Sequence, residues 1–442
     1  MPPQGPSTSK TRRAFSQVVR PSPIDRWGAP ADAAALEGAL DVSDAHEDDA
    51  RALTHGFHPY PARMFPLTAR RSIELLLEDA PPGPVLDPFA GSGTVLVEAL
   101  VAGRNALGVD ANPLAVALAR AKTAVGIDRR ALVDLAHRIA MEVYAAGKDA
   151  RRAGGKPPAP EDQTSPRAKA LKGWFQPHVR RELEALLVAV RSMAKPPLVE
   201  PLELVLTSLL VKLSRRTSDT KDGKVERQLG RGMATRLFAA RAEELAKGLD
   251  ELARANTAKC AATVHVGDAR KLTDAGVPAG SAAAIVTSPP YAGTYDYEDQ
   301  HVLRLAFLDR DEQEFAKAEI GARRNFEDVG LGLARWERDL GASLAAMSRA
   351  LKPGGRAIVL IGDSLAGVGP TATAVFADDV LAKIAPMVGF TIVAAASQAR
   401  LALGGVERRL FSERPKREHL VLLTPAAPRA SATAPRTRGG RA

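Results

Sequence analysis

The chain has 442 residues, a formal net charge of +10 and 45% apolar residues, enough for one large domain with an insertion or for two domains. The positive charge favours a polyanionic partner such as nucleic acid. A single cysteine, Cys260, excludes a disulfide framework and indicates a reducing compartment, so we expect a cytoplasmic protein. No apolar run approaches about 18 residues, which argues against a membrane-spanning helix.

The two ends of the chain differ in composition from the rest. Residues 1–50 are rich in Pro, Ser and Ala and have little apolar periodicity, which predicts a disordered lead-in with a short helix near 33–40. Residues 425–442 form a Pro/Ala/Arg tail that we expect to be disordered. Its arginines are either solvated or in non-specific contact with nucleic acid.

Residues 51–127 alternate between helix and strand, and a glycine-rich turn follows the first strand. The apolar run 85–87 ends at Asp87, and a helix begins near Thr94. Gly91 and Gly93 allow the backbone to come close to a ligand, and the helix start presents unpaired amides. The third glycine of a dinucleotide fingerprint is absent, and no Gly-Lys-Ser/Thr follows as in a P-loop. The pattern therefore predicts a nucleoside-binding loop.

A second strand, 106–109, ends in Asp110, where a carboxylate is placed to bind a ribose diol. A cap on the following helix is the alternative for this residue. Asn112 and Pro113 then start that helix, with proline in its first turn.

Residues 128–257 read as a basic helical insertion. Apolar residues recur at helical spacing over 132–144, 179–193, 202–213 and 235–254. The insertion has 25 lysines and arginines against 17 acidic residues, so it carries most of the net charge. We predict that it recognises DNA, through its densest basic group: Arg215, Arg216, Lys221, Lys224, Arg227 and Arg231. The alternative is a structural helical cap with solvated charges.

Strand and helix alternate again over 258–424. Strands are predicted at 263–268 (ending in Asp268), 282–286, 356–361 after the turn 352–355, 390–395 and 419–423. Alternation of this kind predicts an α/β fold with a largely parallel sheet and helices on both faces.

The strand 282–286 leads into Thr-Ser-Pro-Pro-Tyr at 287–291. Two prolines remove two backbone donors and leave nearby carbonyls free as acceptors at a stiff angle. Ser288 adds a hydroxyl acceptor, and Tyr291 adds a flat apolar face. This segment can hold an exocyclic amine of a base. A Pro-Pro turn with a core tyrosine is the structural alternative.

Three segments together resemble the S-adenosylmethionine-dependent amino-methyltransferases of DNA, which modify cytosine N4 or adenine N6. They are D-P-F-x-G-S-G-T at 87–94, T-S-P-P-Y at 287–291, and H-P-Y-P-A-R-M-F-P at 58–66. The resemblance implies a Rossmann-like sheet of seven strands with one reversed, S-adenosylmethionine as cofactor, double-stranded DNA as partner, association with the nucleoid, and no metal.

The resemblance also assigns roles to residues. The cofactor contacts would be Phe65, Asp87, Phe89, Gly91, Gly93, Thr94, Asp110, Asn112 and Asp268. Asp268 would meet the adenine amine, unless it only caps a helix. The catalytic group would be Ser288, Pro289, Pro290 and Tyr291. Ser288 and the Pro289 carbonyl would accept the amine hydrogens of a flipped base, Tyr291 would stack on it, and Tyr295 and Tyr297 could line the pocket or serve packing.

Serine at the first position of the catalytic motif favours cytosine N4, with adenine N6 as the alternative. An RNA base-amine methyltransferase and a catalytically silent nucleic-acid-binding protein are further alternatives. Methylation at cytosine C5 is disfavoured, because Cys260 lies outside the catalytic loop. The eight histidines and the cysteine do not cluster at zinc-ligand spacing, so no zinc site is expected.

Overall fold

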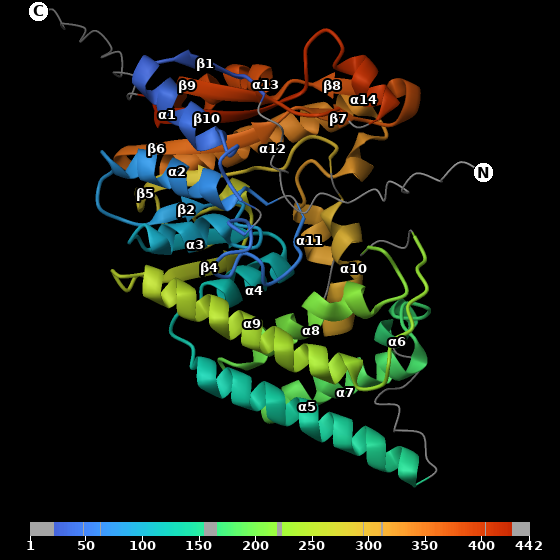
Figure 1. Ribbon diagram of the computed structural model, residues 1–442. Coiled ribbons are helices and arrows are strands. Elements are labelled where there is room, and N and C mark those ends of the chain that lie inside the picture. The colour runs from blue at the N-terminus through green and yellow to red at the C-terminus, as the bar shows by residue number, and fades with distance from the viewer. Residues whose placement is uncertain are drawn as a thin grey trace, which may run out of the picture.

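The computed structural model describes residues 22–46, 48–61, 63–153, 166–218, 223–294, 296–310, 313–402 and 404–426 (Figure 1). Its centre is an eight-stranded sheet. In spatial order the strands are β1 (Ile24–Gly28), β9 (Phe390–Ala399), β10 (Arg417–Pro425), β6 (Leu351–Gly362), β5 (Ala282–Thr287), β2 (Val85–Asp87), β3 (Ala106–Asp110) and β4 (Ala262–Val266). The predicted α/β fold is confirmed. No helix within these ranges is long and apolar enough to cross a membrane.

The five strands from β6 to β4 run parallel, so the chain returns through helices between them. β10 is antiparallel to both of its neighbours, as expected for one reversed strand. β5 is buried along its whole length, and its neighbouring side chains Ile285 and Val286 enter the cores on opposite faces. Ligands of such sheets bind at the carboxyl ends of the strands.

Helices cover both faces of the sheet. On one face lie α1 (Pro30–Leu40), α2 (Pro66–Leu77) and α3 (Thr94–Val101). On the other face lie α12 (Val329–Ala350) and α13 (Ala377–Ile384). The smaller elements are α11 (Gln313–Ala318), α14 (Gly405–Leu410), the hairpin of β7 (Ser364–Ala366) and β8 (Thr373–Val375), and the 3₁₀ turns Ala269–Lys271, Arg323–Phe326, Gly369–Thr371 and Ala385–Val388.

The prediction of disorder over 1–50 is wrong for residues 24–40. β1 adds an eighth strand to the sheet, antiparallel to β9, so two strands are reversed instead of one. Four of its five residues are exposed, which is why the sequence shows no strand pattern: its backbone hydrogen bonds to β9 define it. The short helix expected near 33–40 is present as α1. Residues 1–21 and 427–442, and with them most of the predicted tail, lie outside the described ranges.

The predicted turn at 352–355 lies inside β6 instead of before it. The register between β5 and β6 shifts between Ala282, which pairs with Leu351, and Ala284, which pairs with Arg356. The Lys-Pro-Gly-Gly segment is therefore a bulge, and Gly354 adopts a left-handed φ of 80° there.

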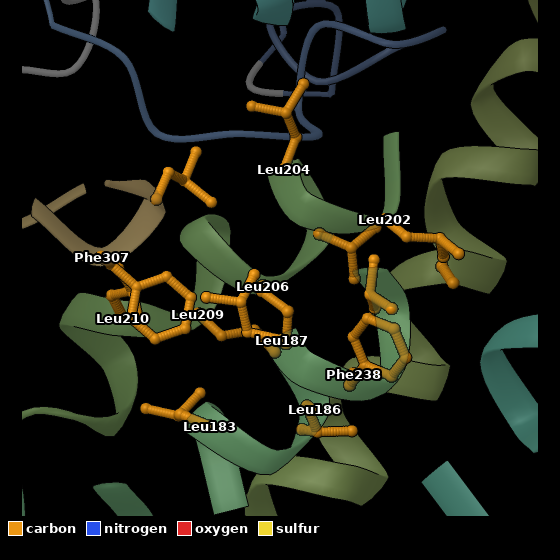
Figure 2. Packing of buried hydrophobic residues seen from close by; sticks show 14 of the residues in the cluster. Leu183, Leu186, Leu187, Leu202, Leu204, Leu206, Leu209, Leu210, Phe238 and Phe307 are labelled. Carbon is orange, nitrogen blue, oxygen red and sulfur yellow. The ribbon is translucent and has the colours of Figure 1, made fainter. Parts of the chain in front are cut away.

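The insertion forms helices α5 (Arg129–Arg152), α6 (Pro166–Ala170), α7 (Pro177–Met193), α8 (Val199–Leu213) and α9 (Met233–Ala255). They lie beyond the β4 edge of the sheet, away from β1 (Figure 1). Their core is shared with the rest of the chain: Leu206 and Leu209 of α8 belong to the same buried cluster as Phe307 of α10 (Tyr297–Leu308) (Figure 2). Leu114 of α4 (Pro113–Lys122) joins it too. The insertion is thus not packed as a separate domain.

Candidate active site

A cleft opens at the carboxyl ends of β2, β3, β4 and β5. The glycine-rich loop (87–94) and the Thr-Ser-Pro-Pro-Tyr loop (287–291) meet there. Two adjoining cavities form it and share Tyr60, Phe89, Gly91 and Ser288. The remaining lining residues are Arg63, Met64, Asp87, Pro88, Ala90, Ser92, Thr94, Val95, Asp110, Ala111, Asn112, Asp268, Ala269, Pro290, Phe315, Ala318, Glu319 and Ile320. Most of the predicted cofactor residues therefore lie around one space.

The two loops are joined directly by Asp87 and Thr287. The Thr287 hydroxyl donates a 2.6 Å hydrogen bond to Asp87 Oδ1, which also accepts from the Phe89 N–H at 3.1 Å. Both side chains are buried. Burial raises the pKa of Asp87 to about 7, and the hydrogen bonds oppose that rise. Asp87 thus holds the two loops together, and it also lines the cleft.

The glycine-rich loop is shaped by its two central glycines and by Asp110. The Gly91 N–H donates to Asp110 Oδ2 at 2.8 Å. Gly93 adopts φ 83° directly before α3, and a Cβ there would lie 2.9 Å from Ala119 Cα, so no other residue fits without a shift. The loop and α4 are therefore in close contact at Gly93.

Asp110 ends β3 as predicted, and its carboxylate is held by backbone. Besides Gly91, it accepts from the Asn112 N–H at 2.8 Å, and burial raises its pKa to about 6. The Asn112 side chain caps α4 through a 2.9 Å bond from the Leu114 N–H. Its buried Nδ2 has no hydrogen-bond partner among the described residues, although the residue lines the cleft. Such an unused donor fits a ligand with hydroxyl or ring acceptors, as a nucleoside has.

Asp268 lines the cleft, but its carboxylate is already engaged. It caps the 3₁₀ turn through the Arg270 N–H at 2.9 Å, and it forms an ion pair with the Arg270 guanidinium at 2.7 Å. Arg270 also pairs with Asp339 at 3.1 Å. The capping role weighed for Asp268 is therefore present in the structure. An adenine amine would have to share this carboxylate with Arg270.

Two of the four residues predicted to be catalytic, in the loop after β5, line the cleft. Ser288 and Pro290 line the cleft, whereas Pro289 is buried and does not. The Trp336 Nε1–H of α12 donates to the Pro290 carbonyl at 2.9 Å, which fixes the loop to a buried side chain. The serine is thus presented on a rigid support.

Tyr291 is not among the residues that line the two cavities, although its side chain also hydrogen-bonds with Ser288. Its hydroxyl donates to Glu418 Oε1 at 3.1 Å, and its ring lies so close to Gly362 that a Cβ there would come within 2.7 Å of Cε2. Burial and the Glu418 carboxylate raise the pKa of Tyr291 well above its usual value. In this arrangement the tyrosine packs against β6 and β10, which was the structural alternative for it. Tyr295 and the side chain of Tyr297 lie outside the described part of the chain.

Phe65 also lies apart from the cleft, packed in a small apolar cluster with Val42 and Ala50. From the same segment, Tyr60 lines the cleft and stacks on His301 of α10 with ring centroids 4.9 Å apart. Four lining residues from the segment 315–320 were not predicted: Phe315, Ala318, Glu319 and Ile320. They belong to α11 and the loop after it, and no periodicity or motif in the sequence sets them apart.

The predicted basic group divides into exposed and structural members. Arg215, Lys224 and Arg231 are exposed. Arg216 lies over the Trp174 ring, 5.5 Å from its centroid. Arg227 donates to the last carbonyls of α8, at 2.7 Å for Val211, 2.8 Å for Lys212 and 3.2 Å for Ser214, so it caps that helix. Lys221 lies outside the described residues.

One cluster away from the cleft has the geometry of metal ligands. Atoms of Asp363, Asp378 and His419 lie within 4.8 Å of one another. His419 contacts Asp363 at 3.0 Å, Asp363 also accepts from two backbone N–H groups, and Asp378 pairs with Arg414. These bonds account for the cluster as a polar network between β6, β10 and α13.

Comparison with known proteins agrees with the first motif. Residues 41–121 match the family model described as DNA methylase. Over 74 residues the chain is 47% identical to the Type II methyltransferase M.MvaI of Kocuria varians, a match that covers 16% of each chain. The chain thus spans about a sixth of the length of this curated relative.

The chain is also weakly similar to solved structures of methyltransferases. The rRNA methyltransferase AviRa of Streptomyces viridochromogenes is 12% identical with a TM-score of 0.32, over 87% of this chain and 93% of that one. The antibiotic-resistance methyltransferase Kmr is 13% identical with a TM-score of 0.26, over 81% and 93%. The match over 41–121 includes the glycine-rich loop, so over this segment the chain is similar to the DNA methylase family.

Proposed function

We propose that this protein transfers a methyl group from S-adenosylmethionine to the exocyclic amine of a DNA base, with N4 of cytosine as the target. The observation that carries the proposal is the hydrogen bond between Thr287 and Asp87, because it places the serine of one loop and the glycines of the other on one cleft. The reaction needs both loops at one cleft, because the methyl carbon of the cofactor and the amine nitrogen of the base must be held about 3–3.5 Å apart.

The bound cofactor would supply an electrophilic methyl group, and the chain would supply position. Gly91, Asp110 and Asn112 line the part of the cleft suited to a nucleoside. The Ser288 hydroxyl stands in the same cleft as an acceptor for an amine hydrogen. An amine held in this way points its lone pair at the methyl group, and its proton can leave after transfer, so no strong base is required.

A base in duplex DNA must leave the stack to reach this cleft. We assign the stacking role first predicted for Tyr291 to Phe315, since Phe315 lines the cavity that also contains Ser288 and Pro290. Tyr291 is occupied with Gly362 and Glu418. The choice of cytosine N4 over adenine N6 rests on the serine in the first motif position alone.

The DNA-binding face in this proposal is the insertion, with Arg215, Lys224 and Arg231 as phosphate contacts. Their exposure leaves them available to a polyanion. The insertion is also anchored to the cleft: the His58 ring contacts Thr207 of α8 at 3.1 Å, and His58 lies two residues before Tyr60. DNA held by the insertion would therefore be held in a fixed relation to the cleft.

The test is transfer of labelled methyl groups from S-adenosylmethionine to mixed duplex DNA, followed by digestion to nucleosides. Label in N4-methylcytosine is expected. Ser288→Ala should lose turnover, whereas Ser412→Ala, a control at an exposed serine, should keep the turnover of the wild type. Label in N6-methyladenine would overturn the choice of base and keep the class.

The remaining outcomes separate the other candidates. Label in RNA alone would replace DNA by RNA as substrate. Retention of DNA with no transfer to any nucleic acid would indicate a silent binding protein and would contradict the proposal.

A further inference from the structure

The connection between β9 and β10, which includes α14, carries a positive charge that the proposed reaction does not use. Residues 400–417 contain six lysines and arginines against two acidic residues, a net charge of +4. Four of the six basic residues form ion pairs: Arg400 with Glu418, Arg414 with Asp378 and Asp379, Lys416 with Glu407, and Arg417 with Asp25. Arg408 and Arg409 of α14 are exposed, and no ion pair joins either of them to a carboxylate within the described ranges.

α14 is held in place on several sides, so the fold fixes the positions of its two arginines. Phe411, directly after α14, is buried and meets Phe376 edge-on, with ring centroids 5.7 Å apart. Lys416, which pairs with Glu407 of α14, also lies 5.9 Å from the centre of the Phe411 ring. The helix packs against β8 as well. Cations on a fixed support lose less conformational entropy on binding than cations on a flexible tail.

This connection lies at the edge of the sheet where the cleft opens. β6 is parallel to β5, and β10 is antiparallel to both β6 and β9, so β9 ends and β10 begins at the edge where β5 ends. β10 is the second neighbour of β5, which places it roughly 10 Å to the side at the usual spacing of strands. The major groove of DNA is about 12 Å wide. A duplex with one base in the cleft would therefore bring phosphates to the level of α14.

Two contacts tie this side of the sheet to the Thr-Ser-Pro-Pro-Tyr loop. Glu418 accepts from the Tyr291 hydroxyl at 3.1 Å and pairs with Arg400 at the start of the connection. The segment after Tyr291 lies against the hairpin of β7 and β8, because a Cβ on Gly293 would come within 2.8 Å of the Leu365 carbonyl oxygen. α14 packs on the same hairpin, so it has a defined position relative to the cleft.

We propose that α14 is a second DNA-binding face, on which Arg408 and Arg409 bind backbone phosphates on the side of the cleft opposite the insertion. This inference rests on the proposed function, because it adds contacts to the same substrate. The insertion lies beyond β4, α14 joins β9 to β10, and the strands that carry the cleft lie between them (Figure 1). Two basic faces in this arrangement would hold the duplex on both sides of the base that leaves the stack.

The test measures the affinity of the full chain for a mixed-sequence DNA duplex by fluorescence anisotropy, over a series of salt concentrations. Arg408→Ala/Arg409→Ala should weaken binding by roughly tenfold at low salt and reduce the slope of log affinity against log salt concentration by about two. Arg254→Ala/Arg349→Ala is the matched control. It removes the same charge from two exposed arginines at the ends of α9 and α12, near the opposite edge of the sheet, and should keep the slope of the wild type. Thermal melting checks that the variants fold.

A combined variant tests whether both faces hold one duplex. Adding Arg215→Ala, Lys224→Ala and Arg231→Ala to the α14 variant should reduce the slope by about five in total. The inference would be overturned if the combined variant fell no further than the three insertion changes alone, or if Arg408→Ala/Arg409→Ala behaved like the control. Either result leaves the proposed function intact when the wild type transfers labelled methyl groups to DNA. If the wild type neither bound nor methylated DNA, the proposed function would fail together with this inference.

Discussion

The hydroxyl of Thr287 donates to the carboxylate of Asp87, joining two chain segments that are 200 residues apart in sequence. β2 and β5 are parallel neighbours, and each of these residues ends its strand. Hydrogen bonds between the strands thus bring both loops to one edge of the sheet, and this side-chain bond fixes their spacing. The helical insertion between the strands leaves this adjacency intact.

Asp87 should make stability depend on pH. Its folded pKa of about 7 lies above the ordinary 3.8, so between these values the folded protein holds a proton that the unfolded chain has released. Stability from this group is therefore present at low pH and lost as pH rises towards 7. Asp87→Asn keeps the oxygen that accepts from Thr287 and removes the ionisation. At pH 8 it should be more stable than the wild type by a few kcal/mol, on the order of the pKa difference.

Urea denaturation from pH 5 to pH 8 measures the free energy of unfolding of Asp87→Asn and of the wild type. The difference between the two free energies should shrink towards pH 5. Asp110, with a pKa raised to about 6, contributes in the same sense in both proteins. Asp149→Asn, at an exposed position on α5, is the control. A constant difference across the range would show that Asp87 is ionised throughout.

Gly93→Ala should destabilise the glycine-rich loop. The left-handed φ and the 2.9 Å approach to Ala119 Cα both oppose a side chain, and strain of this type costs about 1–3 kcal/mol. Gly126→Ala is the matched control, because nothing lies within 4 Å of a Cβ built there. Urea denaturation should separate the two variants, and equal midpoints would contradict the assigned strain.

The sequence predicts those parts of the fold that depend on local pattern. The parallel strands carry continuous apolar runs, and the helices of the insertion show apolar residues at helical spacing, so both were predictable. β1 was not, because an edge strand with four exposed residues is specified by its partner β9. The segment 352–355 predicts a turn and forms a bulge, because Pro and Gly mark both features.

In the site, too, local motifs were predictable and contacts between distant residues were not. Residues in contiguous motifs, such as Gly91, Asp110 and Ser288, were assigned to the cleft and line it. The partners that decide how a side chain is used lie far away in sequence: Glu418 holds Tyr291, and Phe315 enters from a helix without any motif. Such relationships follow from packing, which a single sequence does not reveal.

Asp110→Ala should weaken binding of S-adenosylhomocysteine by at least about tenfold. The change leaves the Gly91 N–H without its 2.8 Å acceptor, so the loop loses the bond that holds its backbone. Asp110→Asn, which can accept from only one of the two N–H groups, should fall between Asp110→Ala and the wild type. Calorimetry measures the affinities. Unchanged affinity in Asp110→Ala would remove Asp110 from the cofactor site.

Phe315→Leu should lower kcat/KM for DNA by roughly tenfold to a hundredfold, the range for stacking of one base on an aromatic ring. Leucine keeps an apolar side chain at this buried position, so folding should be retained. Tyr291→Phe, which removes only the hydroxyl that bonds with Glu418 and Ser288, should change turnover a few-fold at most while lowering the melting temperature. Loss of turnover in Tyr291→Leu, with Phe315→Leu fully active, would return the stacking role to Tyr291.

Arg215, Lys224 and Arg231 should contribute to DNA affinity through phosphates. Replacing any of them by alanine should weaken binding to all duplex sequences alike, and each should reduce the slope of log affinity against log salt concentration by about one. Arg227→Ala is the informative comparison, because this arginine caps α8 through three carbonyls. It should lower the melting temperature and leave the salt slope nearly unchanged. If instead Arg227 alone changed the slope, the DNA-binding face would lie at the end of α8 and not on the exposed side chains around it.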